Sequence, residues 1–267
     1  MDSLQAVILG IVQGLTEFLP VSSSAHLVLV PWAFGWGEPG LLFDTLVHWG
    51  TLLAVVVYFW TDLWKMIKAW VASIARRKID NAEARMAWLI LVATIPAAAI
   101  GYLFGDFFEG LFSSPRAVAA FLIGTGLVLT LSEAFHPKIK KIGSPRLSDA
   151  LTIGLAQAAA IAPGLSRSGL TIAAGLFRGM RRETAARFSF LMSIPIILGA
   201  GLTQVVKAAG VPTGTAWFPL ALGFVAAALS GYLAIHLLLE FVRRRKLWPF
   251  AVYCVVVGLA VLIATLV

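Results

Sequence analysis

The sequence predicts an all-α polytopic membrane protein with six transmembrane helices and two re-entrant helix pairs arranged as an inverted repeat. Of its 267 residues, 60% are hydrophobic and 13% are charged, and the mean hydropathy of +0.90 lies well above that of soluble domains. Apolar runs of membrane-spanning length recur along the chain, without the alternating strand pattern of a membrane barrel. Two further apolar segments are each interrupted near the middle.

The apolar runs define six expected spans, because about 20 apolar residues in a helix cross the hydrocarbon core of a bilayer. These spans are 41–61, 84–105, 116–136, 185–207, 215–241 and 248–266. Residues 65–78 have the pattern of an amphipathic helix on the membrane surface. The single cysteine, Cys254, lies in the last span, which excludes an intramolecular disulfide.

The two interrupted segments are residues 3–35 and 147–177. Polar residues and a proline break the first segment at "LPVSSS", around Pro20, and the second at "APGLSRSG", around Pro163. Each half is too short to span a membrane, and non-helical backbone at membrane depth is tolerated only inside protein or beside a wet cavity. We therefore expect two re-entrant helix pairs.

The two segments also resemble each other. Gly10-x-x-Gln13 precedes the first break and Gly154-x-x-Gln157 precedes the second, and three spans follow each segment. This pattern predicts a duplicated unit within a single membrane domain, 1–267, with unit one at 1–137 and unit two at 146–267. An odd number of crossings per unit inverts unit two, so the two broken tips are expected to meet near the midplane.

The basic residues predict the orientation of the spans. Eighteen of the 21 Lys and Arg residues lie in four clusters, at 65–85, 138–146, 178–187 and 243–246. Placing all four clusters in the cytoplasm lets the six spans alternate and leaves both termini outside. This placement explains the net charge of +8 by topology, so no nucleic-acid partner is expected. The N-terminus has no basic region or cleavage site of a removable signal peptide.

Arg167 lies at the expected tip of the second segment, where topology does not explain it. A buried guanidinium in a membrane is costly unless it is paired or hydrated, which indicates a functional role or a structural ion pair. Gly164 allows close backbone approach, Ser166 and Ser168 donate hydrogen bonds, and the following helix presents free N–H groups. This combination favours phosphate binding, although the short motif alone is a weak signal.

Gln13 and Glu17 lie four residues apart in the first segment and therefore share one helix face. A carboxylate at membrane depth can act as a general base, a general acid or a divalent metal ligand. A metal site here would use Glu17 and Gln13. The structural alternative for Glu17 is a salt bridge to Arg167.

The sequence "SSSAH" supplies further candidates for phosphate binding and catalysis. Ser22 and Ser24 could bind a phosphate, and Ser23 and His26 could act as nucleophile and base or as oxyanion donors. The structural alternatives are a helix N-cap for one of the serines and a core hydrogen bond for the histidine. Asp44 and His48 lie at i and i+4 in the first span, and we expect them to support the site without taking part in catalysis. Gln157 is a third candidate for this supporting role.

The sequences "QGLTEFLPVSSSAHL" and "PGLSRSG" resemble the two signature regions of the bacterial undecaprenyl-diphosphatase family, also called undecaprenyl pyrophosphate phosphatases or bacitracin-resistance proteins. "LFDTLVHWGTLLAVVVYF" and "RETAARFSFLMSIP" resemble two further patterns of the family. The resemblance covers essentially the whole chain. The combination of motifs is highly specific, whereas "SRSG" alone is not.

This resemblance implies hydrolysis of undecaprenyl diphosphate to undecaprenyl phosphate and inorganic phosphate at the outer face of the bacterial plasma (inner) membrane, with recycling of the cell-wall lipid carrier. It also implies a divalent cation, Mg²⁺ or Ca²⁺, and competition by bacitracin, which binds the substrate. The family's catalytic positions fall on Glu17, Ser23, His26 and Arg167, and its variable Glu/Gln position on Gln13. The attacking group, serine, histidine or water, stays open.

Three other interpretations compete with this one. A polyprenyl-lipid transporter or flippase also uses inverted repeats, broken helices and polar groups at the midplane. A phosphatidic-acid-phosphatase type of enzyme would need an arginine-proline element before "SSSAH" and a suitably spaced histidine after "SRSG", and neither is present. A purely structural protein does not explain so many costly polar groups. The small residues of "GTGLVLT" and "FVAAALSGY" could pack helices within one chain or in a homodimer.

Overall fold

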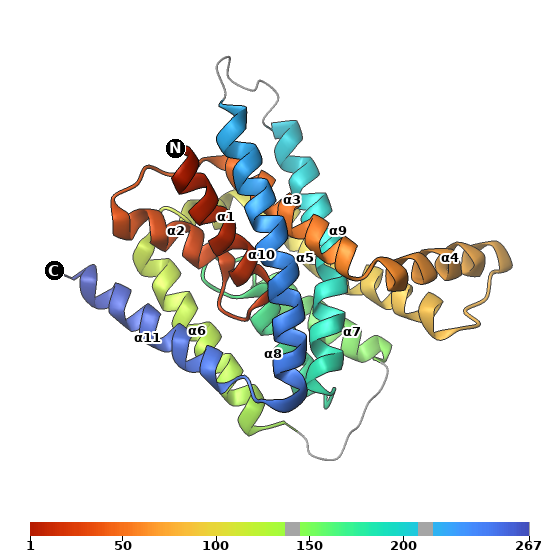
Figure 1. Ribbon diagram of the computed structural model, residues 1–267. Helices are drawn as coiled ribbons and strands as arrows, with labels where there is room; N and C mark the ends of the chain where they lie inside the picture. Colours follow the sequence, from red (N-terminus) through yellow and green to blue (C-terminus); the bar gives the residue numbers. More distant parts are fainter. Residues whose placement is uncertain (137–144, 208–215, 267) are drawn as a thin grey trace.

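The computed structural model describes residues 1–136, 145–207 and 216–266, and every regular element in these ranges is a helix. Figure 1 shows how the helices are arranged. In chain order the helices are α1 (Ser3–Phe18), α2 (Ser23–Phe34), α3 (Leu41–Tyr58), α4 (Trp60–Arg76), α5 (Ala82–Leu111), α6 (Pro115–Ala134), α7 (Leu147–Ala159), α8 (Arg167–Phe177), α9 (Arg182–Lys207), α10 (Trp217–Arg244) and α11 (Trp248–Ala264).

Five helices have the length and hydropathy needed to cross a membrane, and they are α3, α5, α6, α9 and α10. They match the first five spans expected from the sequence, which confirms a polytopic all-α membrane protein. The sixth expected span, 248–266, forms α11, an apolar helix of 17 residues that is shorter than the other five.

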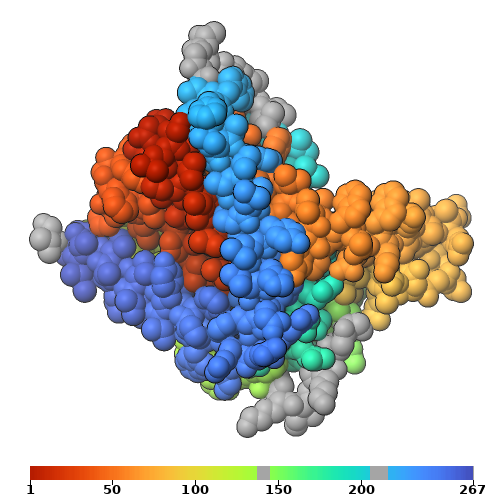
Figure 2. Space-filling view, viewed as in Figure 1, coloured from red at the N-terminus to blue at the C-terminus, as the bar shows by residue number. Residues whose placement is uncertain are grey.

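Helix α4 begins at Trp60, five residues before the amphipathic segment expected from the sequence. Together with the first part of α5 it projects from the rest of the molecule (Figures 1 and 2). Large apolar side chains spaced three or four residues apart are exposed along α4, and they are Trp60, Trp64, Ile67, Val71 and Ile74. This apolar stripe is typical of a helix at a membrane surface.

The two interrupted segments form the short helix pairs α1–α2 and α7–α8. Pro20 and Pro163 lie in the linkers, where no helical hydrogen bond is lost. Each second helix starts at a serine N-cap: the hydroxyl of Ser22 accepts from the N–H of Ala25, and that of Ser166 accepts from Gly169. The polar residues that interrupt the apolar segments therefore begin new helices.

Close packing between helices explains the glycine of the shared Gly-x-x-Gln pattern. Helix α1 packs along α10, and a Cβ atom at Gly10 would lie 2.4 Å from the carbonyl oxygen of Gly223. Helix α7 packs along α5 in the corresponding way, and a Cβ atom at Gly154 would lie 2.4 Å from the carbonyl oxygen of Ala93. Each glycine thus lets the first helix of its pair touch the backbone of a long helix from the other half of the chain.

We expect Gly154→Ala to destabilise the protein, because the added methyl group overlaps the backbone of α5. Overpacking of this kind costs about 1–3 kcal/mol. Thermal unfolding in detergent measures the effect. Gly199→Ala on α9 is the matched control, because a Cβ atom there meets nothing within 4 Å. An unfolding temperature of Gly154→Ala equal to that of the control would contradict the proposed backbone contact.

The small-residue segments named above pack within the chain. A Cβ atom at Gly126 on α6 would lie 2.7 Å from the carbonyl oxygen of Ala251 on α11. At Gly231 on α10 it would lie 3.2 Å from the Cβ atom of Ala54 on α3. These segments therefore pack helices closely within the chain.

The main apolar core lies beside the end of α1. Phe18 is fully buried there, and its ring packs edge-on against that of Phe190 on α9, with 5.2 Å between the ring centroids. This contact fixes the end of α1 against α9. It therefore places Glu17, the residue before Phe18, near Ser189, the residue before Phe190.

Candidate active site

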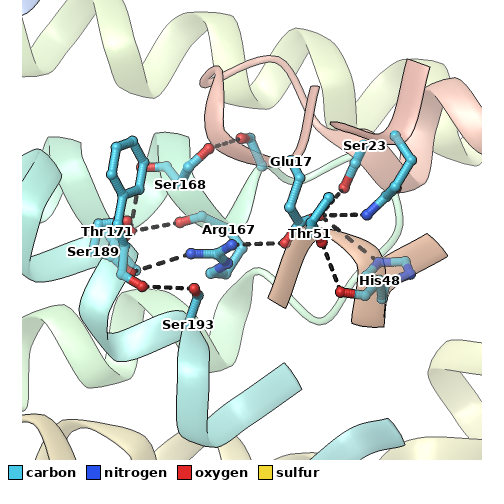
Figure 3. Close-up of polar contacts among 12 residues, drawn as sticks. Glu17, Ser23, His48, Thr51, Arg167, Ser168, Thr171, Ser189 and Ser193 are labelled. Carbon is cyan, nitrogen blue, oxygen red and sulfur yellow. Dashed lines mark hydrogen bonds and ion pairs between the residues drawn. The ribbon is translucent and has the colours of Figure 1, made fainter. Parts of the chain in front are cut away.

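The linkers of the two helix pairs meet. The hydroxyl of Ser168 donates to the carbonyl oxygen of Leu19 over 3.1 Å, and the N–H of Gly164 donates to the hydroxyl of Ser24 over 3.4 Å. An ion pair between Arg167 and Glu17 joins the same two regions (Figure 3). Residues about 150 positions apart in the sequence therefore form one polar cluster.

Glu17 is the centre of this cluster, and its side chain is only 6% exposed. One carboxylate oxygen, Oε2, accepts from the hydroxyl of Ser23 over 2.5 Å and from the amide nitrogen of Gln13 over 3.0 Å. The other, Oε1, accepts from Arg167 over 2.7 Å. The predicted shared helix face of Gln13 and Glu17 is confirmed, and both carboxylate oxygens are hydrogen-bonded.

Arg167 is the first residue of α8, and its side chain is 15% exposed. Besides its ion pair with Glu17, its guanidinium donates to the carbonyl oxygen of Ser189 over 3.2 Å. The hydroxyl of Thr171 contacts both the carbonyl oxygen of Arg167 and the hydroxyl of Ser189. The salt bridge that the sequence left open as an alternative is present, and α9 helps to orient the guanidinium.

The linker before α2 has an unusual backbone at Ser22, whose φ of 69° lies in the left-handed region. For a residue with a side chain this conformation is strained, and such strain is concentrated at functional sites. The ring of His26 donates through Nδ1 to the carbonyl oxygen of Ser22 over 2.7 Å. Ser22 and Ser24 share a hydrogen bond of 3.1 Å between their hydroxyls.

His26 and Ser23 are not hydrogen-bonded to each other. The second ring nitrogen of His26, Nε2, lies 2.7 Å from the hydroxyl of Tyr253 on α11, and the two rings are stacked. The hydroxyl of Ser23 donates to Glu17 instead. The structure thus places a carboxylate, rather than the imidazole, where it can take the proton of Ser23.

Thr125 on α6 holds the linker before α8. Its hydroxyl donates to the carbonyl oxygen of Gly164 over 3.0 Å and accepts from the N–H of Ser166 over 2.9 Å. Gly164 has a φ of +100°, and a Cβ atom there would lie 2.2 Å from the carbonyl oxygen of Val118, so only glycine fits. Nothing in the sequence pattern distinguishes Thr125 from other polar residues in the spans.

Of the three supporting candidates, His48 reaches the cluster. Its Nε2 lies 3.8 Å from Oε2 of Glu17 (Figure 3), and its Nδ1 lies 2.7 Å from the carbonyl oxygen of Asp44. One carboxylate oxygen of Asp44 and both amide atoms of Gln157 are buried and have no hydrogen-bond partner in the described part of the chain. Asp44 therefore contributes its backbone to the site.

The arrangement has the chemistry of an anion-binding, nucleophilic site. A guanidinium and the N-terminus of α8 provide positive potential, and a serine hydroxyl is bonded to a buried carboxylate that can accept its proton. The amide nitrogen of Gln13 donates to Glu17, and the amide oxygen is buried without a partner in the described part of the chain; rotation of the amide group would turn this oxygen toward Glu17 as a metal ligand. Among the described residues, no three His, Cys, Asp or Glu side chains are grouped to hold a metal alone.

Comparisons with known proteins agree with this chemistry. Residues 6–260 match the family model described as bacitracin resistance protein BacA. The chain is 45% identical over 266 residues to an undecaprenyl-diphosphatase of Desulforudis audaxviator, covering 100% of this chain and 99% of the relative. It is 49% identical over 271 residues to an undecaprenyl-diphosphatase of Rubrobacter xylanophilus, covering 100% of this chain and 98% of the relative.

Proposed function

We propose that this chain, which belongs to the bacitracin resistance protein BacA family, is an integral membrane undecaprenyl-diphosphatase. It hydrolyses undecaprenyl diphosphate to undecaprenyl phosphate and inorganic phosphate, which recycles the lipid carrier of cell-wall synthesis. Bacitracin would compete by binding this substrate. The observation that carries the proposal is the cluster of Glu17, Ser23 and Arg167, which joins a nucleophile, a base and an anion-binding group.

Phosphate release from undecaprenyl diphosphate by the purified protein in detergent tests this function. A transporter or flippase performs no chemistry in micelles, where no gradient exists, whereas a phosphatase continues to turn over. We expect release that a chelator abolishes. Absence of release from folded protein at any divalent cation concentration would favour the transporter.

Arg167 and the N-terminus of α8 bind the terminal phosphoryl group in this proposal. The oxygens of the phosphoryl group replace the carboxylate of Glu17 as the partner of the guanidinium. Charge-assisted hydrogen bonds then stabilise the negative charge on these oxygens in the transition state. Phosphoryl transfer depends mainly on such positioning and electrostatic stabilisation. Serine hydroxyls and backbone groups of the two linkers bind the phosphate as well. They belong to Ser22, Ser24, Gly164, Ser166 and Ser168.

Ser23 is the attacking group that the geometry favours. Its oxygen bonds to the terminal phosphorus as the anhydride P–O bond breaks and undecaprenyl phosphate leaves, while its proton passes to Glu17. Water then attacks the phosphoserine and the bond between phosphorus and the serine oxygen breaks. Glu17 returns its proton to the serine oxygen, and inorganic phosphate leaves with the protons of the water. His26 holds the backbone of Ser22 and thereby the position of Ser23. In the alternative mechanism, Glu17 activates water directly.

We expect Ser23→Ala to lower kcat by about 10³-fold or more, because covalent catalysis is lost. Rapid quenching of wild type with substrate labelled in the terminal phosphate should trap labelled protein, and Ser23→Ala should trap none. Ser132→Ala is the matched control, because within the described ranges this buried hydroxyl on α6 bonds to the backbone oxygen of Leu129 alone. Direct attack by water would be established by two results together: kcat of Ser23→Ala falls less than tenfold, and wild type traps no labelled protein.

A divalent cation, Mg²⁺ or Ca²⁺, fits the donor set of Glu17 and Gln13. Magnesium is commonly held by one or two carboxylates together with substrate phosphate oxygens, so a single carboxylate is compatible with it. The cation would offset negative charge on the diphosphate. Gln13 contributes a neutral amide oxygen, which attracts a cation less strongly than a second carboxylate would. We therefore expect the affinity for the cation to depend strongly on the charge of the bound diphosphate.

The membrane arrangement belongs to the same proposal. The chain crosses the bacterial plasma membrane six times, with α11 as the last crossing, the termini outside, and the site open to the outer face. The corresponding packing of α1 on α10 and of α7 on α5 supports an inverted repeat of units 1–137 and 146–267 in one domain. Membrane lipids surround the long helices, and a homodimer would use surfaces other than the small-residue segments.

A further inference from the structure

We propose that His48 is a ligand of the divalent cation at this site, and that its imidazole shifts the preference of the site from Mg²⁺ and Ca²⁺ toward Mn²⁺ and Co²⁺. The inference rests on the proposed function, since the cation is the one that accompanies the diphosphate. It concerns a residue on α3, outside both broken helix pairs.

Hydrogen bonding sets the tautomer of His48. A carbonyl oxygen can only accept, so Nδ1 of His48, at 2.7 Å from the carbonyl oxygen of Asp44, carries the proton. In the neutral ring Nε2 is then an acceptor. Metal-binding histidines nearly always donate their other ring nitrogen in this way, to a backbone carbonyl or a carboxylate. The hydroxyl of Thr51 also donates to the carbonyl oxygen of His48 over 2.7 Å, which steadies this turn of α3.

The acceptor nitrogen faces another acceptor. Nε2 of His48 and Oε2 of Glu17 are 3.8 Å apart, too far for a hydrogen bond between them. A divalent cation between them would be held by the imidazole nitrogen and the carboxylate oxygen together. The side chain of His48 is 33% exposed, whereas that of Glu17 is 6% exposed, so His48 lies on the accessible side of the cluster.

Gln13 lies beside the same carboxylate oxygen of Glu17. Its side chain is fully buried, its amide nitrogen donates to Glu17, and its amide oxygen, on the other side of the amide group, has no hydrogen-bond partner among the described residues. Rotation of the amide group exchanges its nitrogen and oxygen, which turns a metal ligand toward Glu17. Gln13, Glu17 and His48 then provide two oxygens and one nitrogen.

This donor set predicts the metal preference. Mg²⁺ and Ca²⁺ prefer oxygen ligands alone, whereas imidazole nitrogen suits first-row transition metals. The other histidine of the cluster, His26, already uses both ring nitrogens, on Ser22 and Tyr253. His48 is thus the histidine whose nitrogen is left to bind a cation at this site.

Pulsed electron paramagnetic resonance of bound Mn²⁺ tests the inference. The sample is full-length protein in detergent with Mn²⁺ and the methylene diphosphonate analogue of farnesyl diphosphate. We expect nitrogen modulation from one directly bound imidazole, which changes to the ¹⁵N pattern when the histidines are labelled. His48→Gln should remove it and weaken Mn²⁺ binding about tenfold or more. His236→Gln, at an exposed histidine on α10, should leave both unchanged.

Activity provides a second readout. The ratio of kcat/KM with Mn²⁺ to that with Mg²⁺ should fall at least fivefold in His48→Gln and stay unchanged in His236→Gln. Bound Mn²⁺ without nitrogen modulation, modulation that persists in His48→Gln, or no Mn²⁺ binding would each overturn the proposal. If the protein binds Mn²⁺ through nitrogen but releases no phosphate, the cation site is supported and the proposed phosphatase activity is refuted.

Discussion

Arg167→Ala is expected to lower kcat/KM for undecaprenyl diphosphate by about 10³-fold or more, while the protein still inserts and purifies. Removing one preorganised group that stabilises transition-state charge costs about 10²–10³-fold, and an arginine that contacts a transferred phosphoryl group can contribute about 10³–10⁵-fold. Arg167 also holds Glu17 in place, so its loss affects the base as well. Steady-state phosphate release in detergent measures the effect.

Two variants sharpen this prediction. Arg167→Lys keeps the charge but cannot hold Ser189 and a phosphate oxygen with one planar group, so it should recover only a small part of the activity. Arg243→Ala removes an arginine at the end of α10 that pairs with Glu183, and should retain activity. Near-normal turnover of Arg167→Ala would remove the central role assigned to this residue.

Glu17→Gln should lower kcat by about 10³-fold, because the neutral amide cannot take the proton of Ser23. At a saturating concentration of the divalent cation KM should not rise, since Arg167 loses the anion that competes with the phosphate for its guanidinium. A loss in kcat with unchanged or lower KM separates this catalytic role from a structural ion pair. A structural pair would instead lower the stability of the protein and leave the turnover of the folded fraction intact.

Glu183→Gln is the matched control for Glu17→Gln, because it also removes a carboxylate paired with an arginine, near the start of α9. We expect this control to keep wild-type kcat. A kcat of Glu17→Gln within threefold of the control would exclude Glu17 as the base.

The long helices and the centre of the site follow from local patterns in the sequence. Apolar length defined five spans, and the Gly-x-x-Gln pattern with its prolines located both helix pairs. The spacing of Gln13 and Glu17 put both side chains on one face, where they are hydrogen-bonded. The meeting of Glu17 with Arg167 was expected because inversion of the second unit brings the two tips together.

Contacts that depend on tertiary packing carry no such pattern. Tyr253 lies 227 residues from His26, and nothing near either residue marks the pair. Thr125 is a polar residue in an apolar helix and resembles others there, and the pattern "RETAARFSFLMSIP" contains Ser189 without indicating its contact with Arg167. His48 had the visible i, i+4 relation to Asp44, but its approach to Glu17 depends on how α1 packs against α3.

The central claim is that the two broken helix pairs form one phosphatase site through Glu17 and Arg167. Phosphate release by wild type, Glu17→Ala, Arg167→Ala and the double variant in detergent tests it most directly, because groups that act as a unit are strongly non-additive. We predict release by wild type and a double variant no slower than the slower single variant. Losses that multiply, or no release from folded wild type, would contradict the account.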